Sequence, residues 1–327
     1  MSANVTYLLG AGASCSTLPT IESLTDEIGH LGQILKNQND TPPSNFKNYS
    51  LVEKLGDDLL WLWNAAQNHL TIDTLAKKMY LQDELLQLER LKCTLSIFFM
   101  YKQFTNRPDK RYDGLLASLL IKNGPFVKLP ENVKILTWNY DCQIELSAMD
   151  YLEQSFQATL VNINSFPRNQ FTGNPSIIHL NGISGYVKGD HSIQILTPPS
   201  LNSAAQILDE ILSFIDESNR GPYNFKGLIS FAWEQNPISQ KAIEFAGEIM
   251  SKTDVLIVIG YSVPFFNRQI DRMIFYDRFI NTGGSPKKIY FQNPYLDGTF
   301  LTSQFKIDKK FIEHIEDCKQ FYIPYEL

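Results

Sequence analysis

The sequence lacks any close pair of cysteines. Its four cysteines, Cys15, Cys93, Cys142 and Cys318, are widely separated along the chain. Zinc knuckles and redox dithiols need cysteines a few positions apart, so this spacing excludes both kinds of site. Disulfides are rare in cytosolic proteins, and the cysteines are therefore expected to be buried thiols. We predict no metal site.

The sequence also lacks a long apolar run and a concentration of charge of one sign. No run approaches the roughly 18 to 20 apolar residues that a membrane helix needs, so we expect a cytoplasmic protein without a membrane partner. The 29 basic and 35 acidic residues give a net charge of -6. The basic residues form short groups, such as Lys77–Lys78, Arg107–Arg111 and Lys287–Lys288, which are typical of solvated surface. Direct nucleic-acid binding by this chain alone is not expected.

What the sequence has is a set of short runs rich in Val, Ile, Leu and Tyr. A chain of 327 residues, 43% of them hydrophobic, is long enough to bury a full core. Five of these runs are typical of fully buried parallel strands. They are Val5–Leu9, Val133–Thr137, Ser176–His179, Asp254–Ile259 and Lys288–Phe291. The sequence therefore predicts an α/β fold, a Rossmann-like doubly wound parallel sheet.

Each predicted strand ends at a polar or glycine-containing tip. In an open parallel sheet, ligands bind outside the carboxyl ends of the strands, where the following loops converge. The five tips are therefore expected to form one site. They are Gly10-Ala11-Gly12, Trp138-Asn139-Tyr140-Asp141, His179-Leu180-Asn181-Gly182, Gly260-Tyr261-Ser262 and Gln292-Asn293-Pro294.

Between the first and second strands the pattern becomes helical. A helix is expected to begin near Thr20, and a loop with two prolines covers Asp40–Asn48. We interpret residues 36–124 as a helical subdomain inserted into a core made of residues 1–35 and 125–327, all within a single domain. A second helical stretch is predicted over Ser203–Ser218.

The first tip is a candidate phosphate-binding loop. Gly10, Gly12 and Ser14 suit a turn that brings backbone amides against a phosphate, although a tight strand-to-helix turn explains them as well. A dehydrogenase fingerprint would place a third glycine at Cys15 and an acidic residue at the end of a second strand. Neither is present, which makes hydride transfer a weaker hypothesis. No Gly-Lys-Ser/Thr follows the loop, which argues against a nucleoside triphosphatase.

Taken together, the order and spacing of the tips resemble the sirtuin family over most of the chain. The resemblance implies that NAD is the bound dinucleotide and that Asn139 and Asp141 lie near its nicotinamide ribose, with His179 as the catalytic base. It also implies two sets of dinucleotide contacts. Phosphate contacts come from Gly10, Ala11, Gly12 and Ser14, and the adenosine side is bound by Gly260, Tyr261, Ser262 and Asn293, with Tyr261 replacing the usual threonine.

Each catalytic candidate also has a purely structural interpretation. Asn139 and Asp141 are residues that commonly cap a helix, here one beginning near Gln143. His179, with apolar neighbours, has the surroundings of a core histidine bonded to backbone. Taken singly, these interpretations are the better ones. The coincidence of five polar tips at five strand ends favours a functional site.

The sequence departs from protein-deacylating sirtuins in two respects. It has no zinc module with two close cysteine pairs, and no Pro-Asp-Phe-Arg segment follows the glycine loop. In this it resembles sirtuin-like proteins of bacterial antiphage defence, which hydrolyse NAD. The resemblance implies an NAD glycohydrolase that releases nicotinamide and ADP-ribose, working with a second copy or a regulatory protein of the same operon. The alternatives are a module that senses NAD or ADP-ribose without catalysis and, less favoured, an NAD-dependent protein deacylase.

Overall fold

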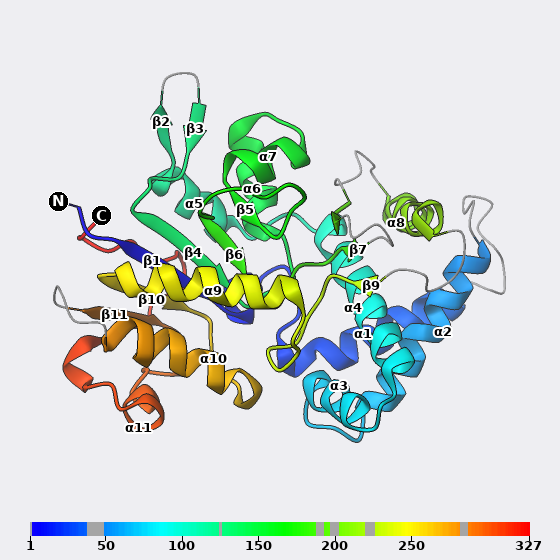
Figure 1. The fold of residues 1–327 in the computed structure, drawn as a ribbon. Coiled ribbons are helices and arrows are strands. Elements are labelled where there is room, and N and C mark those ends of the chain that lie inside the picture. Colours follow the sequence, from blue (N-terminus) through cyan, green and yellow to red (C-terminus); the bar gives the residue numbers. More distant parts are fainter. Residues whose placement is uncertain are drawn as a thin grey trace. The chain divides into compact units, whose positions relative to one another are not determined.

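The computed structural model describes residues 2–37, 49–123, 126–187, 193–196, 203–219, 226–281 and 287–327. The chain divides into two compact units, each built from separate segments. The sheet unit comprises Met1–Cys15, Pro108–Gly182 and Phe231–Leu327, and the helical unit comprises Ser16–Arg107 and Ile183–Ser230. Figure 1 shows the elements of both units.

The sheet unit contains a seven-stranded parallel sheet with the strand order β12-β11-β10-β1-β4-β6-β5. This confirms the predicted α/β fold, and the five predicted strands form its centre. The strands are β1 (Val5–Leu9), β4 (Val133–Thr137), β5 (Ser165–Phe166), β6 (Ile177–His179), β10 (Val255–Ile259), β11 (Lys288–Gln292) and β12 (Ile312–Ile315).

The register of the strands brings their carboxyl ends level. Leu9 at the end of β1 pairs with Thr137 on one side and with Ile259 on the other. Thr137 in turn pairs with His179, and Ile259 pairs with Gln292. The loops after these five strands therefore begin at one edge of the sheet.

Two hydrophobic clusters cover the two faces of this sheet. Successive residues of a strand point to opposite faces, so Leu8 of β1 belongs to one cluster and its neighbours Tyr7 and Leu9 belong to the other. Helix α9 contributes Phe245 to the Leu8 cluster, and helix α5 contributes Tyr112 to the Tyr7 cluster. The longer helices of the unit are α5 (Lys110–Leu119), α6 (Gln143–Leu152), α7 (Phe156–Asn162) and α9 (Pro237–Lys252).

The C-terminal third of the sheet unit adds shorter elements. A π-helix, Met273–Ile280, continues α10 and buries Phe275 and Phe279. The aromatic residues of the tail also serve the core, because Phe305 and Phe321 are buried. The other short elements of this third are η3 (Phe265–Asn267), α10 (Arg268–Arg272), α11 (Phe300–Phe305) and η5 (Lys309–Phe311). Earlier in the sheet unit the short elements are η1 (Ala11–Ser14), β2 (Ile121–Asn123) and β3 (Phe126–Lys128).

The helical unit contains the predicted helical stretches. The helix expected near Thr20 begins at Ile21, and the stretch expected over Ser203–Ser218 forms α8. The loop predicted over Asp40–Asn48 lies outside the described residues. The elements of this unit are α1 (Ile21–Asn37), α2 (Tyr49–Ala66), α3 (Ile72–Leu81), α4 (Leu85–Thr105), β7 (Tyr186–Val187), β8 (Ile193–Gln194), α8 (Ala204–Asn219) and β9 (Lys226–Gly227).

The division into units differs from the predicted insertion of residues 36–124 in three places. Residues 16–35, predicted as part of the core, belong to the helical unit, which begins at Ser16. Helix α5 belongs to the sheet unit because it buries Tyr112, Leu115 and Leu116 in the core of that unit. The segment Ile183–Ser230 belongs to the helical unit, where the Gln103 amide of α4 donates to the hydroxyl of Ser184 at 3.2 Å. Both contacts join segments distant in sequence, which a local helical pattern does not reveal.

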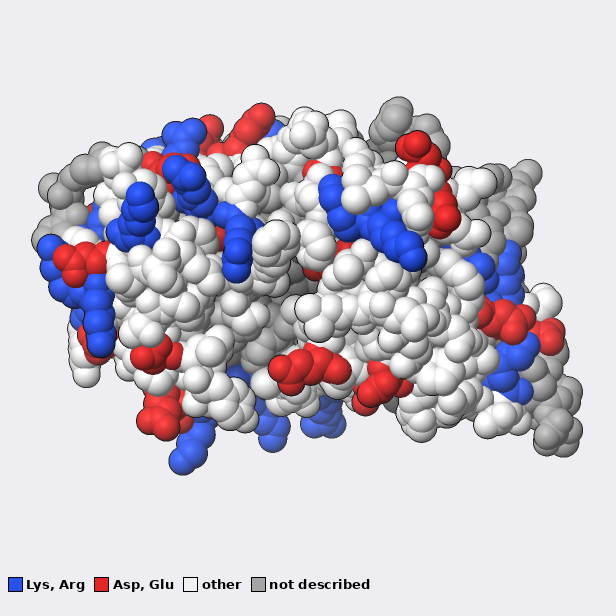
Figure 2. Space-filling model, turned by 90° about the horizontal axis from the view of Figure 1, so that it is seen from below, with Lys and Arg blue, Asp and Glu red and all other residues white. Residues whose placement is uncertain are grey.

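Charge on the surface is mixed on the face drawn in Figure 2, where Lys and Arg side chains lie among Asp and Glu side chains. This agrees with the short basic groups noted in the sequence. Over the residues that the structure describes, no helix is both long and apolar enough to cross a membrane.

Candidate functional site

The glycine loop after β1 and the loop after β10 touch through their backbones. The Gly12 amide donates to the Gly260 carbonyl at 2.9 Å. A Cβ on Gly12 would lie 2.8 Å from the Gly260 Cα, and a Cβ on Gly260 would lie 2.4 Å from the Gly12 carbonyl carbon. Gly260 also has a φ of +59°, which favours glycine. Close approach of the two loops therefore requires glycine at both positions.

Three amides of the glycine loop already have backbone partners. Gly10 donates to Ile259 at 3.0 Å, Gly12 donates to Gly260, and Ala13 donates to the Gly10 carbonyl at 2.9 Å. For these amides the geometry fits the tight-turn interpretation. The loop includes the short η1 (Ala11–Ser14), in which Ser14 is buried.

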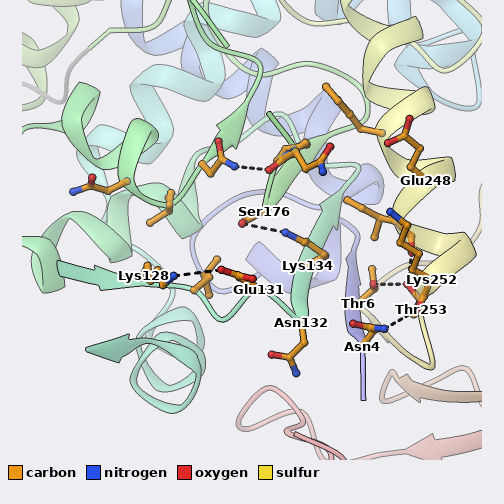
Figure 3. Close-up of a pocket in the computed structure, with 18 residues that line it drawn as sticks. Asn4, Thr6, Lys128, Glu131, Asn132, Lys134, Ser176, Glu248, Lys252 and Thr253 are labelled. Carbon is orange, nitrogen blue, oxygen red and sulfur yellow. Dashed lines mark hydrogen bonds and ion pairs between the residues drawn. The ribbon is translucent and has the colours of Figure 1, made fainter. Parts of the chain in front are cut away.

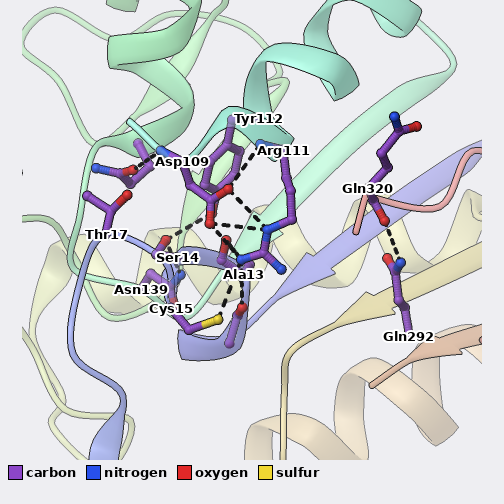
Figure 4. A network of polar contacts seen from close by, with 12 residues as sticks. Ala13, Ser14, Cys15, Thr17, Asp109, Arg111, Tyr112, Asn139, Gln292 and Gln320 are labelled. Carbon is purple, nitrogen blue, oxygen red and sulfur yellow. Dashed lines mark hydrogen bonds and ion pairs between the residues drawn. The ribbon is translucent and has the colours of Figure 1, made fainter. Parts of the chain in front are cut away.

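Ser14 connects the first strand tip to the second. Its hydroxyl oxygen accepts from the Asn139 side-chain amide at 3.3 Å and lies 3.1 Å from the hydroxyl of Tyr112 (Figure 4). Asn139 is held in turn by its backbone amide, which donates to the Thr137 hydroxyl at 3.0 Å. The burial of Tyr112 raises its pKa well above the usual value, so its phenol is neutral. These contacts bring Ser14 and Asn139, both predicted site residues, together.

Asp141 closes the second tip and lies one residue before Cys142, the N-cap residue of α6. Its carboxylate accepts from the amide of Gln143, the first residue of α6, at 3.1 Å, so it satisfies a helix-end amide from outside the N-cap position. The same side chain is almost fully buried beside Ser14. Burial raises the pKa of Asp141 to about 6, although hydrogen bonds from Gln143 and Ser14 and the charge of His179 oppose the rise. A carboxylate that titrates near neutrality is thus present at the tip.

His179 forms a buried ion pair that the sequence did not indicate. Its Nε2 lies 2.8 Å from Glu145 of α6, and its Nδ1 lies 3.3 Å from the Asn139 carbonyl oxygen. The Ser165 hydroxyl donates to the same Glu145 oxygen at 2.7 Å. Because both ring nitrogens face acceptors, the contacts suit an imidazolium that donates from each. His179 therefore has partners from two neighbouring segments, α6 and the tip after β4, and Ser165 holds its partner Glu145.

The pKa values of the two partners move in opposite directions. Burial disfavours the charged form of His179, but the adjacent Glu145 carboxylate outweighs burial and raises its pKa. Burial likewise acts to raise the pKa of Glu145, but the charge and hydrogen bond of His179 lower it below the usual value. Both shifts favour the ion pair. The only sequence signal for Glu145 was an acidic residue between Ile144 and Leu146 in a helix that starts at a strand tip.

The aromatic ring of Tyr261, in the tip after β10, is buried in the protein interior. The Tyr261 hydroxyl donates to the Asp271 carboxyl at 2.8 Å and accepts from the Asn267 amide at 2.9 Å. Its ring stacks on Trp138 with centroids 6.0 Å apart. Burial raises the pKa of Asp271 well above its ordinary value. Tyr261 therefore anchors the loop, while the neighbouring Ser262 is exposed.

The fifth tip stabilises its own turn and the C-terminal tail. The Asn293 side-chain oxygen accepts from the Tyr295 and Leu296 amides at 2.9 and 3.0 Å. The Gln292 side-chain amide donates to the carbonyls of Asp317 and Gln320, each at 2.6 Å (Figure 4). The structure thus gives Asn293 a local role in the loop at the end of β11.

Arg111 of α5 is a residue that the sequence interpretation placed wrongly. It was assigned to solvated surface, yet its side chain is 14% exposed and forms an ion pair with the buried Asp109 at 2.6 Å. Its Nη2 also donates to the carbonyls of Gly12 and Ala13 at 3.2 and 3.1 Å (Figure 4). An arginine from a helix, distant in sequence, therefore contacts the glycine loop.

The four cysteines are free thiols, but they are not all buried. Cys93 and Cys142 are buried as expected, whereas Cys15 is exposed and Cys318 is partly exposed. The expectation of burial was wrong for Cys15, which with Ser16 forms an exposed stretch directly after the buried Ser14. Within the described ranges, no group of three or more His, Cys, Asp and Glu side chains is arranged to hold a metal ion.

A separate cavity of about 480 Å³ lies at the opposite edge of the sheet (Figure 3). Residues at or near the amino ends of the strands line it, among them Asn4, Lys134, Ser176 and Thr253. None of the predicted site residues lines this cavity. It is therefore distinct from the candidate site.

No protein-family model matches the chain, and no curated protein sequence matches it. Several solved structures are similar to it. A Sir2 homologue in complex with NAD has a TM-score of 0.43 and 16% identity, covering 89% of this chain and 77% of that chain. A Sir2 variant with a deacetylated p53 peptide and 3'-O-acetyl ADP-ribose has a TM-score of 0.43 and 15% identity, covering 96% and 87%. A Sir2 homologue mutant with ADP-ribose has a TM-score of 0.41 and 13% identity, covering 89% and 80%.

Proposed function

We propose that this chain binds NAD at the carboxyl edge of its sheet and hydrolyses the bond between nicotinamide and ribose. One observation carries the proposal. Ser14 from the first strand tip and Asn139 from the second are hydrogen bonded at 3.3 Å, with Asp141 and His179 buried in the same group. These are the residues that the sirtuin resemblance assigns to NAD. The similar Sir2 structures with NAD and ADP-ribose agree with this choice of ligand.

The reaction suits a site with few ionisable groups. The nicotinamide ring of NAD is cationic, so the electron pair of the breaking C–N bond leaves with it and yields neutral nicotinamide. No general acid is required. The ribose carbon becomes oxocarbenium-like, as in glycoside hydrolysis, and a water oxygen then forms the new C–O bond. One proton from that water has to pass to a base, and the second product is ADP-ribose.

In this proposal each buried residue has a distinct task. Asp141 places a negative charge near the developing positive charge of the ribose, which lowers the barrier. The Asn139 amide orients the attacking water or the ribose hydroxyls. The His179–Glu145 pair is the base: the imidazolium first releases a proton to solvent and then accepts one from water. Activity therefore depends on deprotonation of the pair.

The direct test is to incubate the purified protein with NAD and to follow nicotinamide and ADP-ribose by chromatography. We expect Asn139→Ala and His179→Ala to abolish turnover, with circular dichroism to verify that each variant is folded. His30→Ala is the matched control, because His30 is an exposed histidine of α1. Turnover by the first two variants at the wild-type rate would refute the catalytic assignment.

A sensing module is the second candidate function, and the buried contacts favour it specifically. Both ring nitrogens of His179 have protein partners, as in a site that binds a ligand without proton transfer. Calorimetry distinguishes the two: NAD binding without cleavage, also in the presence of the product of a neighbouring gene, indicates a sensor. Loss of an acyl group from an acyl-lysine peptide would instead indicate the deacylase.

We further propose that the activity serves antiphage defence and is held in check by a second copy or a partner protein. The support is the absence of the deacylase zinc module and substrate segment from the sequence. Cells that express the chain together with its genomic neighbour should lose NAD after phage infection, and cells with the Asn139→Ala chain should keep it. An unchanged NAD level in both strains would contradict this role.

A further inference from the structure

We propose that Arg111 is a positioning residue that holds the glycine loop in the form that binds the pyrophosphate of NAD. The inference rests on the proposed function, because it assigns a residue to the dinucleotide site. It adds a helix, α5, that the sequence resemblance did not connect with the ligand.

The first support is the set of contacts that fix the guanidinium. Its Nε donates to both carboxylate oxygens of Asp109 at 3.0 and 3.1 Å, and its Nη2 donates to Asp109 at 2.6 Å. Its planar group also lies over the Phe321 ring, 4.9 Å from the centroid. A fork held on one side by a carboxylate and on one face by an aromatic ring has little freedom left. Arg111 is therefore a rigid support.

The second support is what this rigid group holds. The Nη2 atom of Arg111 donates to two consecutive carbonyls of the loop, those of Gly12 at 3.2 Å and Ala13 at 3.1 Å. Carbonyl oxygens repel phosphate oxygens, whereas amides attract them. By binding both carbonyls, Arg111 keeps their negative ends on its own side and lowers their repulsion of a bound pyrophosphate.

The third support is that, of the two adjacent basic residues at the start of α5, only Arg111 contacts the glycine loop. Lys110, the preceding residue of α5, is exposed, and Asp109 before it is buried and caps the helix by accepting from the Arg111 amide at 3.0 Å. The charge at position 111 is therefore the one turned toward the loop. Lys110 offers a matched control for a change of net charge at the same helix end.

The test measures binding of ADP-ribose, and separately of adenosine, which lacks phosphate, by calorimetry. We expect Arg111→Gln to weaken ADP-ribose binding by about tenfold or more, because charge-assisted bonds to the loop are lost, and to leave adenosine binding unchanged. Lys110→Gln should bind both ligands like the wild type. In turnover assays Arg111→Gln should raise KM for NAD with little change in kcat.

Two further variants distinguish positioning from a merely structural role. Asp109→Asn keeps the helix cap and the arginine, and its side-chain oxygen can still accept from the guanidinium, so ADP-ribose binding should weaken less than in Arg111→Gln. The double variant Asp109→Asn with Arg111→Gln leaves no buried unpaired carboxylate and should fold yet bind weakly. Wild-type ADP-ribose affinity in the folded double variant, or equal weakening by both single variants, would overturn the role of Arg111. Failure of the wild type to bind NAD or ADP-ribose would instead overturn the proposed function.

Discussion

The buried pair of His179 and Glu145 sets how the site responds to pH. A raised histidine pKa contributes stability that is complete below the unfolded value of about 6.5 and is lost as pH rises through the folded pKa. A lowered glutamate pKa contributes stability above its unfolded value that is lost as pH falls through the folded pKa. The ion pair therefore stabilises the fold most at pH values above the unfolded pKa of Glu145 and below the unfolded pKa of His179.

Replacing Glu145 by glutamine tests the pair. The change preserves the shape of the side chain but removes the charge that holds His179 protonated, so the pKa of His179 should fall. Because both side chains are almost fully buried, we expect a loss of about 3 to 5 kcal/mol in the free energy of unfolding, measured in urea. Because the proposed base would then lose its proton at lower pH, the acid limb of NAD turnover that belongs to His179 should move to lower pH. A variant as stable as the wild type, with the same pH profile, would be inconsistent with a buried ion pair.

Asp141 should give activity and stability opposite dependences on pH. Its folded pKa is about 6, above the ordinary value of 3.8, so the folded state binds a proton more tightly than the unfolded state. Its contribution to stability therefore increases as pH falls from about 6 toward 4. Activity that needs the carboxylate should decrease over the same interval. A pH series of NAD turnover measures this: Asp141→Asn should lose the decrease in activity that occurs near pH 6 and keep the acid limb that belongs to deprotonation of His179.

At the scale of elements, the contact between the loops after β1 and β10 is tested by Gly260→Ala. The added methyl meets the Gly12 backbone and the positive φ adds strain, so we expect a loss of about 3 kcal/mol or more in unfolding free energy. Gly173→Ala is the control: it also has a positive φ, +85°, but no atom lies within 4 Å of the added Cβ. A similar loss in both variants would mean that strain alone, without loop contact, determines the effect.

The central strands could be predicted from the sequence, and the edge strands could not. Fully buried strands are continuous apolar runs, and all five of these runs form strands. β5 has two residues and β12 contains Glu313 and His314, so neither carries that signal. The tips were predictable because each follows a run directly. Glu145 and Arg111 lie on helices and reach the site through tertiary contacts, which have no counterpart in local sequence.

At the scale of the whole molecule, the helical unit cannot be removed as one continuous segment. Residues 183–230 belong to it as well as residues 16–107, and α8 packs on α4. Deleting residues 36–124 would therefore leave the apolar side of α8, with Ile207, Leu208 and Ile211, without its partner. We expect aggregation or loss of cooperative unfolding, measured by size-exclusion chromatography and thermal denaturation. A monomeric, cooperatively folded deletion variant would contradict this division.

The order of the strands also has a consequence for the protein during its synthesis. β1 is made before the other strands of this sheet but lies in its middle, and one of its two neighbours, β10, begins only at Val255. A nascent chain has β1 and β4 long before Gly260 can contact Gly12. The ribosome must therefore add Gly260 before the two glycine loops can meet, and a nascent chain that has not reached this residue lacks the complete proposed site.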